Sequence, residues 1–356
     1  MIILDTNQLH RNRTLDTPTL SILAAVARVT DNVLALPAIV IEEFVARYEH
    51  DVSEAVDAIG KSFRDYRGLN RTWSPQDPAL PPAKSVAMEH GTRLRQMFEI
   101  LVVTGDIARM ALSREILRQR PASIVWKNQG SGARDAAIWL TVLEQLRQGD
   151  VYFVSDDKVA FGDGQLHAEL EAEASQYGGE GQLVFCPNLD VLLQLLAQQE
   201  TLSDEETQLI ANDPKVHAVV QESLTDPRSF GELITYLHHL PNISSFSAPN
   251  PPVLSLEDIS RTTAYRVEGQ LWISSRIKWT CQKEIVVNRP HPEDNEEWIA
   301  RFRVSTTLLV SLGQDKEVLD AQTTAVSPLD VFQVSPALRW LGSVGATAYD
   351  ATVETT

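Results

Sequence analysis

Hydrophobic and polar positions divide the chain into two parts that differ in period. Up to about residue 200, short apolar runs alternate with stretches in which apolar residues recur every three or four positions. The short runs predict strands at Ile2–Leu4, Val33–Leu36, Val151–Val154 and Leu183–Phe185. Strands that alternate with helices are typical of a parallel sheet covered by helices. We therefore predict an α/β domain over residues 1–200, with helices on both faces of its sheet.

The helices of this domain are predicted from apolar spacing and from the positions of proline. One helix begins at Pro18, because proline suits the first helical turn, and the longest runs from about Ala38 to Tyr66. The stretch Thr72–Pro82 holds four prolines and predicts turns. Further helices are expected at about 84–101, 106–119, 133–148, 166–176 and 189–199, with a loop at 120–132.

The pattern changes after residue 200. Residues 201–245 are predicted to form a helical connector, in which Ser203 and Glu206 have the spacing of a capping box. Beyond a proline-rich linker, Tyr265–Val287 and Trp298–Leu312 are rich in β-branched and aromatic residues and predict two long antiparallel strands. We expect a smaller β-rich domain over residues 253–356, whose role the sequence does not indicate.

Composition adds that the protein is an ordinary globular one. Of its 356 residues, 43% are hydrophobic and 22% are charged, and no apolar run approaches the roughly 18 residues that suggest a membrane span. The first residues lack the features of a signal peptide. The two cysteines, Cys186 and Cys281, do not make a disulfide framework or a zinc site. We therefore expect a cytoplasmic protein that does not contact membranes.

The charge of the chain is acidic overall but uneven. The net charge is −17, whereas residues 61–134 contain 13 basic and only 6 acidic side chains. Within that region Lys61, Arg64, Arg67 and Arg71 recur at helical spacing, which favours either a nucleic-acid contact or a solvated helix face. The charge therefore permits nucleic-acid binding but does not require it.

Acidic residues occur where strands of this pattern give way to helices. Asp5 ends the first strand, Asp156 and Asp157 end the third, and Asp135 lies in the first turn of a helix. Active sites of open parallel sheets form at the carboxyl ends of the strands. Each acid alone is also compatible with an ordinary turn or a helix start. Together, their order and context predict one acidic site.

Glu42 and Glu43 extend this set, because they lie in an otherwise apolar helix start. A carboxylate on the apolar face of a helix is costly unless it is paired or binds a cation. Carboxylate oxygens are ligands that suit Mg²⁺ or Mn²⁺. The eight histidines show no ligand spacing that would compete for the role.

Four blocks of residues resemble the conserved segments of PIN domains, in the same order. They are Ile2-Ile3-Leu4-Asp5-Thr6-Asn7, Pro37-Ala38-Ile39-Val40-Ile41-Glu42-Glu43-Phe44, Gly132-Ala133-Arg134-Asp135-Ala136-Ala137-Ile138-Trp139 and Val151-Tyr152-Phe153-Val154-Ser155-Asp156-Asp157-Lys158. The resemblance covers about residues 1–200. The long segment between the second and third blocks is similar to a larger PIN-like branch rather than to minimal PIN toxins.

The resemblance implies a metal-dependent endoribonuclease that hydrolyses RNA phosphodiesters with one or two Mg²⁺ or Mn²⁺ ions. It assigns four metal ligands, Asp5, Glu43, Asp135 and Asp157, and leaves Asp156 as a variable fifth acid. Supporting residues follow from the same blocks. Thr6 and Ser155 would hydrogen-bond the ligands, Asn7 would brace the loop after the first strand, and Arg134 would contact the scissile phosphate or pair with a carboxylate. Lys61, Arg64, Arg67 and Arg71 would contact the RNA backbone.

Two alternative functions are compatible with the same residues, and a third is not. A PIN-like module could bind RNA or a protein without cleaving, and a structure-selective DNA nuclease could use the same acids. A haloacid-type phosphatase is excluded, because that chemistry needs a second Asp two residues after the first and position 7 is Asn. By analogy, the C-terminal region could bind an antitoxin or another protein, as in a toxin–antitoxin pair, and the chain could form a homodimer.

Overall fold

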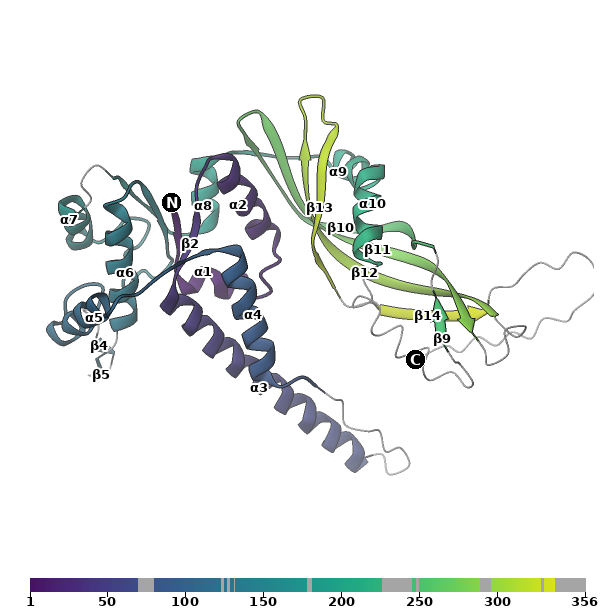
Figure 1. Cartoon of the computed structure of the whole chain (residues 1–356), viewed down its shortest axis with the longest axis horizontal. Coiled ribbons are helices and arrows are strands. Elements are labelled where there is room, and N and C mark those ends of the chain that lie inside the picture. The colour runs from purple at the N-terminus through teal and green to yellow at the C-terminus, as the bar shows by residue number, and fades with distance from the viewer. Residues whose placement is uncertain are drawn as a thin grey trace, which may run out of the picture. The chain divides into compact units, whose positions relative to one another are not determined.

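The computed structural model describes residues 1–69, 80–122, 125–126, 129–130, 132–177, 181–225, 245–247, 250–288, 296–327 and 330–336. Contacts between residues divide the chain into two compact units. The first contains Met1–Leu15 and Leu23–Gln198, and the second contains Asp16–Ile22 and Gln199–Thr356. Each unit has its own sheet (Figure 1). Most of the turns predicted at Thr72–Pro82 lie outside the described residues.

The sheet of the first unit is parallel throughout and has the strand order β3-β2-β1-β6-β7. Its strands are β1 (Ile2–Leu4), β2 (Leu34–Pro37), β3 (Glu99–Leu101), β6 (Val151–Val154) and β7 (Leu183–Cys186). The three residues of β1 are fully buried because β1 lies in the middle of the sheet between β2 and β6. The predicted α/β fold with a parallel sheet is confirmed.

Helices cover this sheet, and the order of strands and helices is largely the predicted one (Figure 1). Helices α3 and α4 pack along each other, and Figure 1 shows that they extend away from the sheet as a pair, here called the α3–α4 arm. A short hairpin of β4 and β5 lies between α5 and α6. The elements are α1 (Thr6–Arg11), α2 (Pro18–Val29), α3 (Ala38–Leu69), α4 (Ala83–Met97), α5 (Gly105–Leu117), β4 (Val125–Trp126), β5 (Gln129–Gly130), α6 (Ala133–Leu146), α7 (Ala168–Tyr177) and α8 (Leu189–Leu196).

Three local predictions for this unit are corrected. The helix expected at 84–101 ends at Met97, because the backbone becomes extended at Phe98 and Glu99–Leu101 pairs with β2 as strand β3. The helix expected at 189–199 ends at Leu196, and Gln198–Glu200 forms strand β8 of the second sheet. Residues Thr6–Arg11 form a helix that was not predicted, where a loop was expected after the first strand.

The second unit is a curved antiparallel sheet with two helices on one face (Figure 1). The helices are α9 (Asp204–Ala211) and α10 (Pro214–Ser223), and the predicted capping box of Ser203 and Glu206 is present. Residues 226–244 of the predicted connector lie outside the described residues. Beside β8, the strands are β9 (Ser245–Ser247), β10 (Val253–Val267), β11 (Gln270–Asn288), β12 (Glu296–Leu312), β13 (Val318–Val326) and β14 (Asp330–Pro336).

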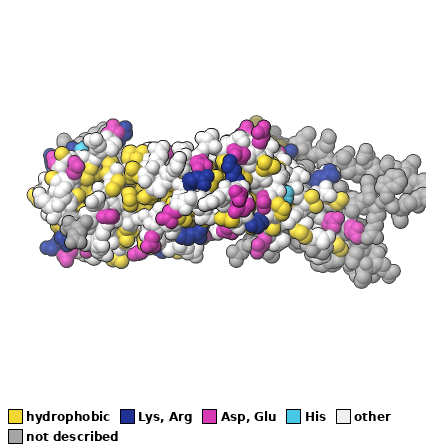
Figure 2. Space-filling view, turned by 90° about the horizontal axis from the view of Figure 1, so that it is seen from above, with side chains coloured by type: hydrophobic (Ala, Val, Ile, Leu, Met, Phe, Trp, Pro, Cys, Tyr) yellow, Lys and Arg dark blue, Asp and Glu magenta, His cyan; other side chains and the backbone are white. Residues whose placement is uncertain are grey.

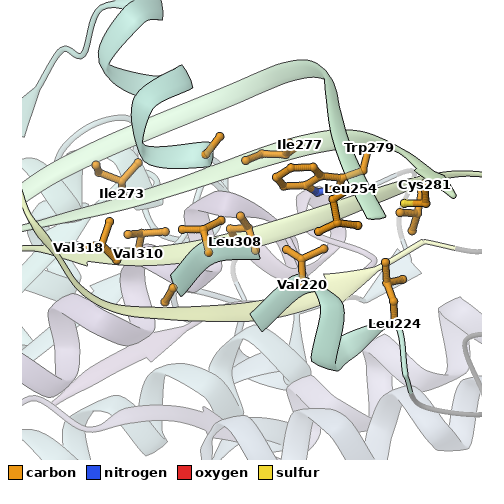
Figure 3. Close-up of a cluster of buried hydrophobic side chains, with 14 of the residues drawn as sticks. Val220, Leu224, Leu254, Ile273, Ile277, Trp279, Cys281, Leu308, Val310 and Val318 are labelled. Carbon is orange, nitrogen blue, oxygen red and sulfur yellow. The ribbon is translucent and has the colours of Figure 1, made fainter. Parts of the chain in front are cut away.

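The core of the second unit lies between α10 and the inner face of this sheet (Figure 3). Trp279 is fully buried there, and its indole nitrogen donates a hydrogen bond to Thr306 Oγ1 at 2.8 Å. The stretch predicted as one strand, Tyr265–Val287, is two strands, because the chain reverses at Glu268 and Gly269, whose φ angles are 48° and 85°.

Figure 2 shows that Lys and Arg side chains lie beside Asp and Glu side chains on the face that it presents. No helix in the described part of the chain is both long and apolar enough to cross a membrane.

Candidate active site

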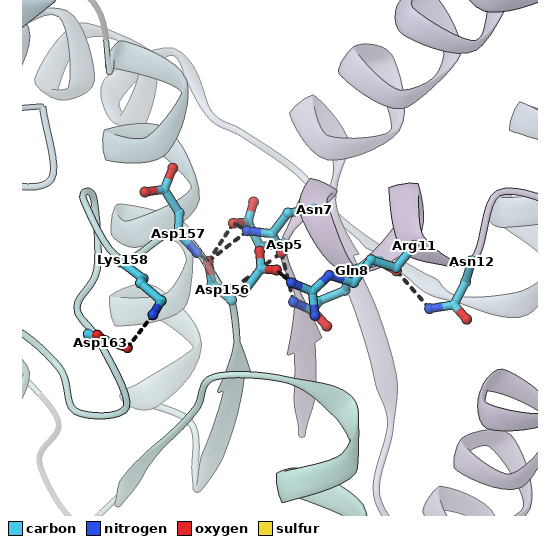
Figure 4. Close-up of polar contacts among 10 residues, drawn as sticks. Asp5, Asn7, Gln8, Arg11, Asn12, Asp156, Asp157, Lys158 and Asp163 are labelled. Carbon is cyan, nitrogen blue, oxygen red and sulfur yellow. Dashed lines mark hydrogen bonds and ion pairs between the residues drawn. The ribbon is translucent and has the colours of Figure 1, made fainter.

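Asp5 stands where β1 ends and α1 begins, and its side chain is 5% exposed. Its carboxylate accepts three hydrogen bonds: from the backbone N–H of Thr6 at 2.7 Å, from Asn7 Nδ2 at 2.9 Å and from Ser155 Oγ at 2.6 Å (Figure 4). These donors fix the orientation of the carboxylate. Asn7 therefore braces Asp5 from the first turn of a helix, not from the loop that was expected.

Ser155 joins Asp5 to the end of the neighbouring strand β6. Its side chain is fully buried, and its Oγ also accepts a hydrogen bond from the backbone N–H of Asp157 at 3.1 Å. The Asp157 carboxylate accepts the N–H groups of Val159 at 3.0 Å and Ala160 at 2.8 Å. Asp157 thus caps the turn that follows β6, and one serine connects two of the four predicted ligands.

Of the two adjacent glutamates in α3, Glu42 is exposed, whereas Glu43 is partly buried and faces the site. Thr6 Oγ1 donates a hydrogen bond to Glu43 Oε2 at 2.9 Å. The other oxygen of Glu43 forms an ion pair with Arg134. Of the two roles that the sequence left open for Arg134, pairing with a carboxylate is the one that this arrangement shows.

The four predicted ligands influence one another electrostatically. The pKa of Asp135 is raised to about 7. Burial is the largest cause, the negative charges of Asp5, Asp157 and Glu43 also raise the pKa, and Arg134 lowers it. Burial also raises the pKa of Asp5 to about 6, against the hydrogen bonds from Ser155 and Thr6, which lower it. Four carboxylates from four different segments therefore lie near one another at the carboxyl edge of the sheet.

The four carboxylates are oxygen donors of the kind that divalent cations bind. Among the described residues, no three His, Cys, Asp or Glu side chains are grouped so that they could hold a metal ion as they stand. Glu43 is engaged by Arg134 and Asp157 by backbone N–H groups. The chemistry of the set nevertheless fits Mg²⁺ or Mn²⁺, because these are hard oxygen donors and two of them carry raised pKa values that a cation would lower.

The fifth acid, Asp156, is turned to a different partner. It forms an ion pair with Arg11 of α1, and its backbone N–H lies 3.5 Å from Asn7 Oδ1 (Figure 4). Sequence reasoning missed Arg11 and also Gln8, which is 1% exposed and donates a hydrogen bond to Asn7 Oδ1 at 2.9 Å. Both residues lie on α1. A prediction of this helix from the sequence would have placed them near Asp5.

The predicted backbone-binding residues lie far from the acids. Lys61 and Arg64 are exposed on α3, Arg67 is partly buried, and Arg71 lies outside the described residues. Lys61 is about 27 Å and Arg67 about 36 Å along the helix from Glu43, at about 1.5 Å per residue. These side chains therefore cannot touch a phosphate that is held at Asp5 or Asp135.

A comparison with known protein families gives a match for the first part of the chain. Residues 2–161 match the family model described as PIN domain, and the matched range contains all four predicted ligands. No curated protein and no solved structure matches the chain.

Proposed function

We propose that this chain, whose residues 2–161 form a PIN domain, is a metal-dependent endoribonuclease. PIN domains are typically nucleases, and this one keeps a carboxylate at each of the four ligand positions that the resemblance assigns. The observation that carries the proposal is the grouping of the other three acids around Asp135, whose pKa their charges help burial to raise. Asp5 is buried and Asp135 is half-buried, and both have raised pKa values, an unfavourable state that a bound divalent cation would relieve.

Each residue of the site would have a separate role in cleavage. A divalent ion held by Asp5, Glu43, Asp135 and Asp157 would supply an activated water and neutralise charge on the phosphate. Ser155 and Asn7 hold the Asp5 carboxylate in place, and Thr6 holds that of Glu43. The Arg134 side chain is 62% exposed, so its guanidinium can exchange Glu43 for an incoming phosphate.

The α3–α4 arm would bind RNA away from the cleaved bond. Lys61 and Arg64 are exposed, and no described acidic side chain forms an ion pair with either. At a spacing of about 3.4 Å per nucleotide, the 27 to 36 Å along α3 corresponds to roughly eight to eleven nucleotides. The arm would therefore strengthen binding of long RNA and leave short RNA unaffected.

A second candidate function is an RNA-binding PIN domain that does not cleave. The pairing of Glu43 with Arg134 and the capping role of Asp157 favour it, because both carboxylates already have partners in the protein. The two functions differ in whether a divalent cation can draw these carboxylates from those partners.

The deciding experiment uses labelled single-stranded RNA and DNA of the same sequence, with Mn²⁺ or Mg²⁺ and with chelator. It compares the wild type with Asp135→Asn, which removes one ligand charge, and with Asp163→Asn, an exposed acid of the same region that pairs with Lys158. We expect RNA cleavage by the wild type and by Asp163→Asn, loss of at least a hundredfold for Asp135→Asn, and no cleavage in chelator.

Three results would count against this proposal. Cleavage by Asp135→Asn at the wild-type rate would remove the site assignment. Binding of RNA by the wild type without cleavage under any metal would support the binding module. Faster cleavage of DNA than of RNA would replace the ribonuclease by a DNA nuclease.

A further inference from the structure

The first unit contains a polar pocket of about 550 Å³. It is formed where the end of α5 and the residues after it face the start of α7. Its lining residues are Arg114, Arg118, Gln119, Arg120, Glu169, Leu170 and Glu173. Three arginines and two glutamates give the lining a net positive charge, and the volume is in the range of small-ligand pockets.

One arginine of the pocket has a structural role. Arg114 pairs with Glu173 and donates a hydrogen bond to the carbonyl of Arg120 at 2.9 Å. Glu173 also accepts a hydrogen bond from the indole nitrogen of Trp139, which is fully buried, at 2.8 Å. These partners lie within the protein, so Arg114 and Glu173 hold α5 and α7 together and are not available to a ligand.

The other two arginines are available to a ligand. Arg118 is exposed, and no described acidic side chain pairs with it. Arg118 ends α5 with a left-handed backbone, φ 55°, a conformation that usually favours glycine. The backbone conformation therefore does not explain why an arginine stands there. Arg120 forms an ion pair with Glu169, whose side chain is 75% exposed. A surface pair of this kind contributes at most about 1 kcal/mol, so a phosphate can displace Glu169.

The pocket is connected to the candidate metal site by a single turn. Arg120 Nη1 donates a hydrogen bond to the carbonyl of Val159 at 3.1 Å, and the N–H of Val159 donates to the Asp157 carboxylate at 3.0 Å. A group bound by Arg120 therefore lies against the same turn that carries Asp157.

We propose that this pocket binds a backbone phosphate of RNA close to the cleaved bond, through Arg118 and Arg120. The proposal rests on the proposed ribonuclease function and adds a substrate subsite to it. Guanidinium groups match phosphate oxygens in geometry and in charge, and their hydrogen bonds to phosphate are charge-assisted. Glu169 competes with the phosphate for Arg120, so its removal strengthens RNA binding.

The test measures binding separately from cleavage. Binding of a fluorescent single-stranded RNA is followed in chelator over a range of salt concentrations, with the full chain. The variants are Arg118→Ala and Glu169→Gln. The matched control is Arg109→Ala, because Arg109 is an exposed arginine of α5 that pairs with Asp106 and does not line the pocket.

We expect Arg118→Ala to weaken RNA binding about fivefold at low salt and to reduce the salt slope by about 0.7, the value for one lost phosphate contact on a single strand. Glu169→Gln should tighten binding, and Arg109→Ala should change neither quantity. An unchanged slope in Arg118→Ala, or weaker binding by Glu169→Gln, would overturn the subsite. Inorganic phosphate that binds the pocket as tightly as RNA would assign it to a free anion instead.

Failure of the subsite and failure of the ribonuclease proposal give different results. If the wild type cleaves RNA but Arg118→Ala binds RNA normally, the subsite is wrong and the enzyme remains. If Arg118→Ala loses affinity but the wild type cleaves no RNA, the pocket binds RNA in a protein that is not a ribonuclease.

Discussion

At the scale of single residues, Asp135 is the clearest source of a pH-dependent stability. Its pKa is raised to about 7, so the folded protein holds this proton more tightly than the unfolded chain, in which the pKa is about 3.8. The free energy of unfolding therefore falls as the pH rises from about 4 to about 7, because the folded protein loses the proton that it binds more tightly. Above about pH 7 this loss of stability stays constant. Asp5 has a pKa of about 6, so its contribution to the free energy of unfolding also falls as the pH rises.

We predict that Asp135→Asn stabilises the metal-free protein at pH 8 by about 2 kcal/mol, after allowance for solvent screening, and has little effect at pH 4. Urea unfolding of both proteins in chelator measures this difference. The control is Asp163→Asn, which removes an exposed acid. Equal stability of wild type and Asp135→Asn at pH 8 would show that the charge of Asp135 carries no cost.

Ser155 gives a second prediction at this scale. It is fully buried and bonds to Asp5, Asn7 and the backbone of Asp157, so Ser155→Ala leaves three polar groups short of a partner. We expect a loss of about 2 kcal/mol in the free energy of unfolding, together with a higher Mn²⁺ concentration for half-maximal cleavage.

Ser175→Ala serves as the control for this change, because the side chain of Ser175 is exposed and donates a hydrogen bond to a carbonyl of its own helix, that of Glu171. If Ser155→Ala lowers stability but leaves the Mn²⁺ requirement unchanged, Ser155 supports the fold without positioning the ligands.

The sequence predicted which acids lie together but not which side chains pair with them. Asp5 and Asp157 could be predicted to lie together, because each ends a strand and parallel strands end at one edge. The pairing of Arg134 with Glu43 could not, since it depends on how α6 meets α3 in space. The same holds for the pocket, which joins residues near 118 to residues near 169 without any periodic signal.

At the scale of elements, the α3–α4 arm places charge at a fixed distance from the acids. We predict that replacing Lys61 and Arg64 by Gln weakens binding and cleavage of long RNA about fivefold and leaves RNA shorter than roughly eight nucleotides unaffected. Cleavage rates and affinities are measured on an RNA ladder, so that short RNA is the control within the same variant. An equal loss at every length would contradict a role of the arm at a distance.

The elements that were missed share a physical cause. Strand β3 has only three residues, which is too few for a period to appear, and its identity is set by pairing with β2. The reversal at Glu268–Gly269 interrupts a run of β-forming residues with just one recognisable turn residue. The long helix α3 and the central strand β1 were predicted well, because length and continuous apolarity leave few alternatives.

At the scale of the whole molecule, each unit has its own sheet and core, which predicts two unfolding transitions. Two tryptophans allow each transition to be assigned. Trp139 in the first unit and Trp279 in the second are both fully buried, and each donates an indole hydrogen bond, to Glu173 and Thr306 respectively. Replacing either tryptophan by phenylalanine removes the same atoms and one indole hydrogen bond, so the two variants are a matched pair.

We predict that Trp139→Phe and Trp279→Phe each lower one transition by about 2 kcal/mol and leave the other unchanged, because a cavity and an unpaired acceptor arise in one core only. Mn²⁺ should raise the transition that Trp139→Phe lowers, since the candidate ligands Asp5 and Asp135 belong to the first unit and a cation binds only the folded form. Calorimetry with and without chelator measures both. A rise with Mn²⁺ in the transition that is sensitive to Trp279 would place the metal site in the second unit and remove the basis of the ribonuclease proposal.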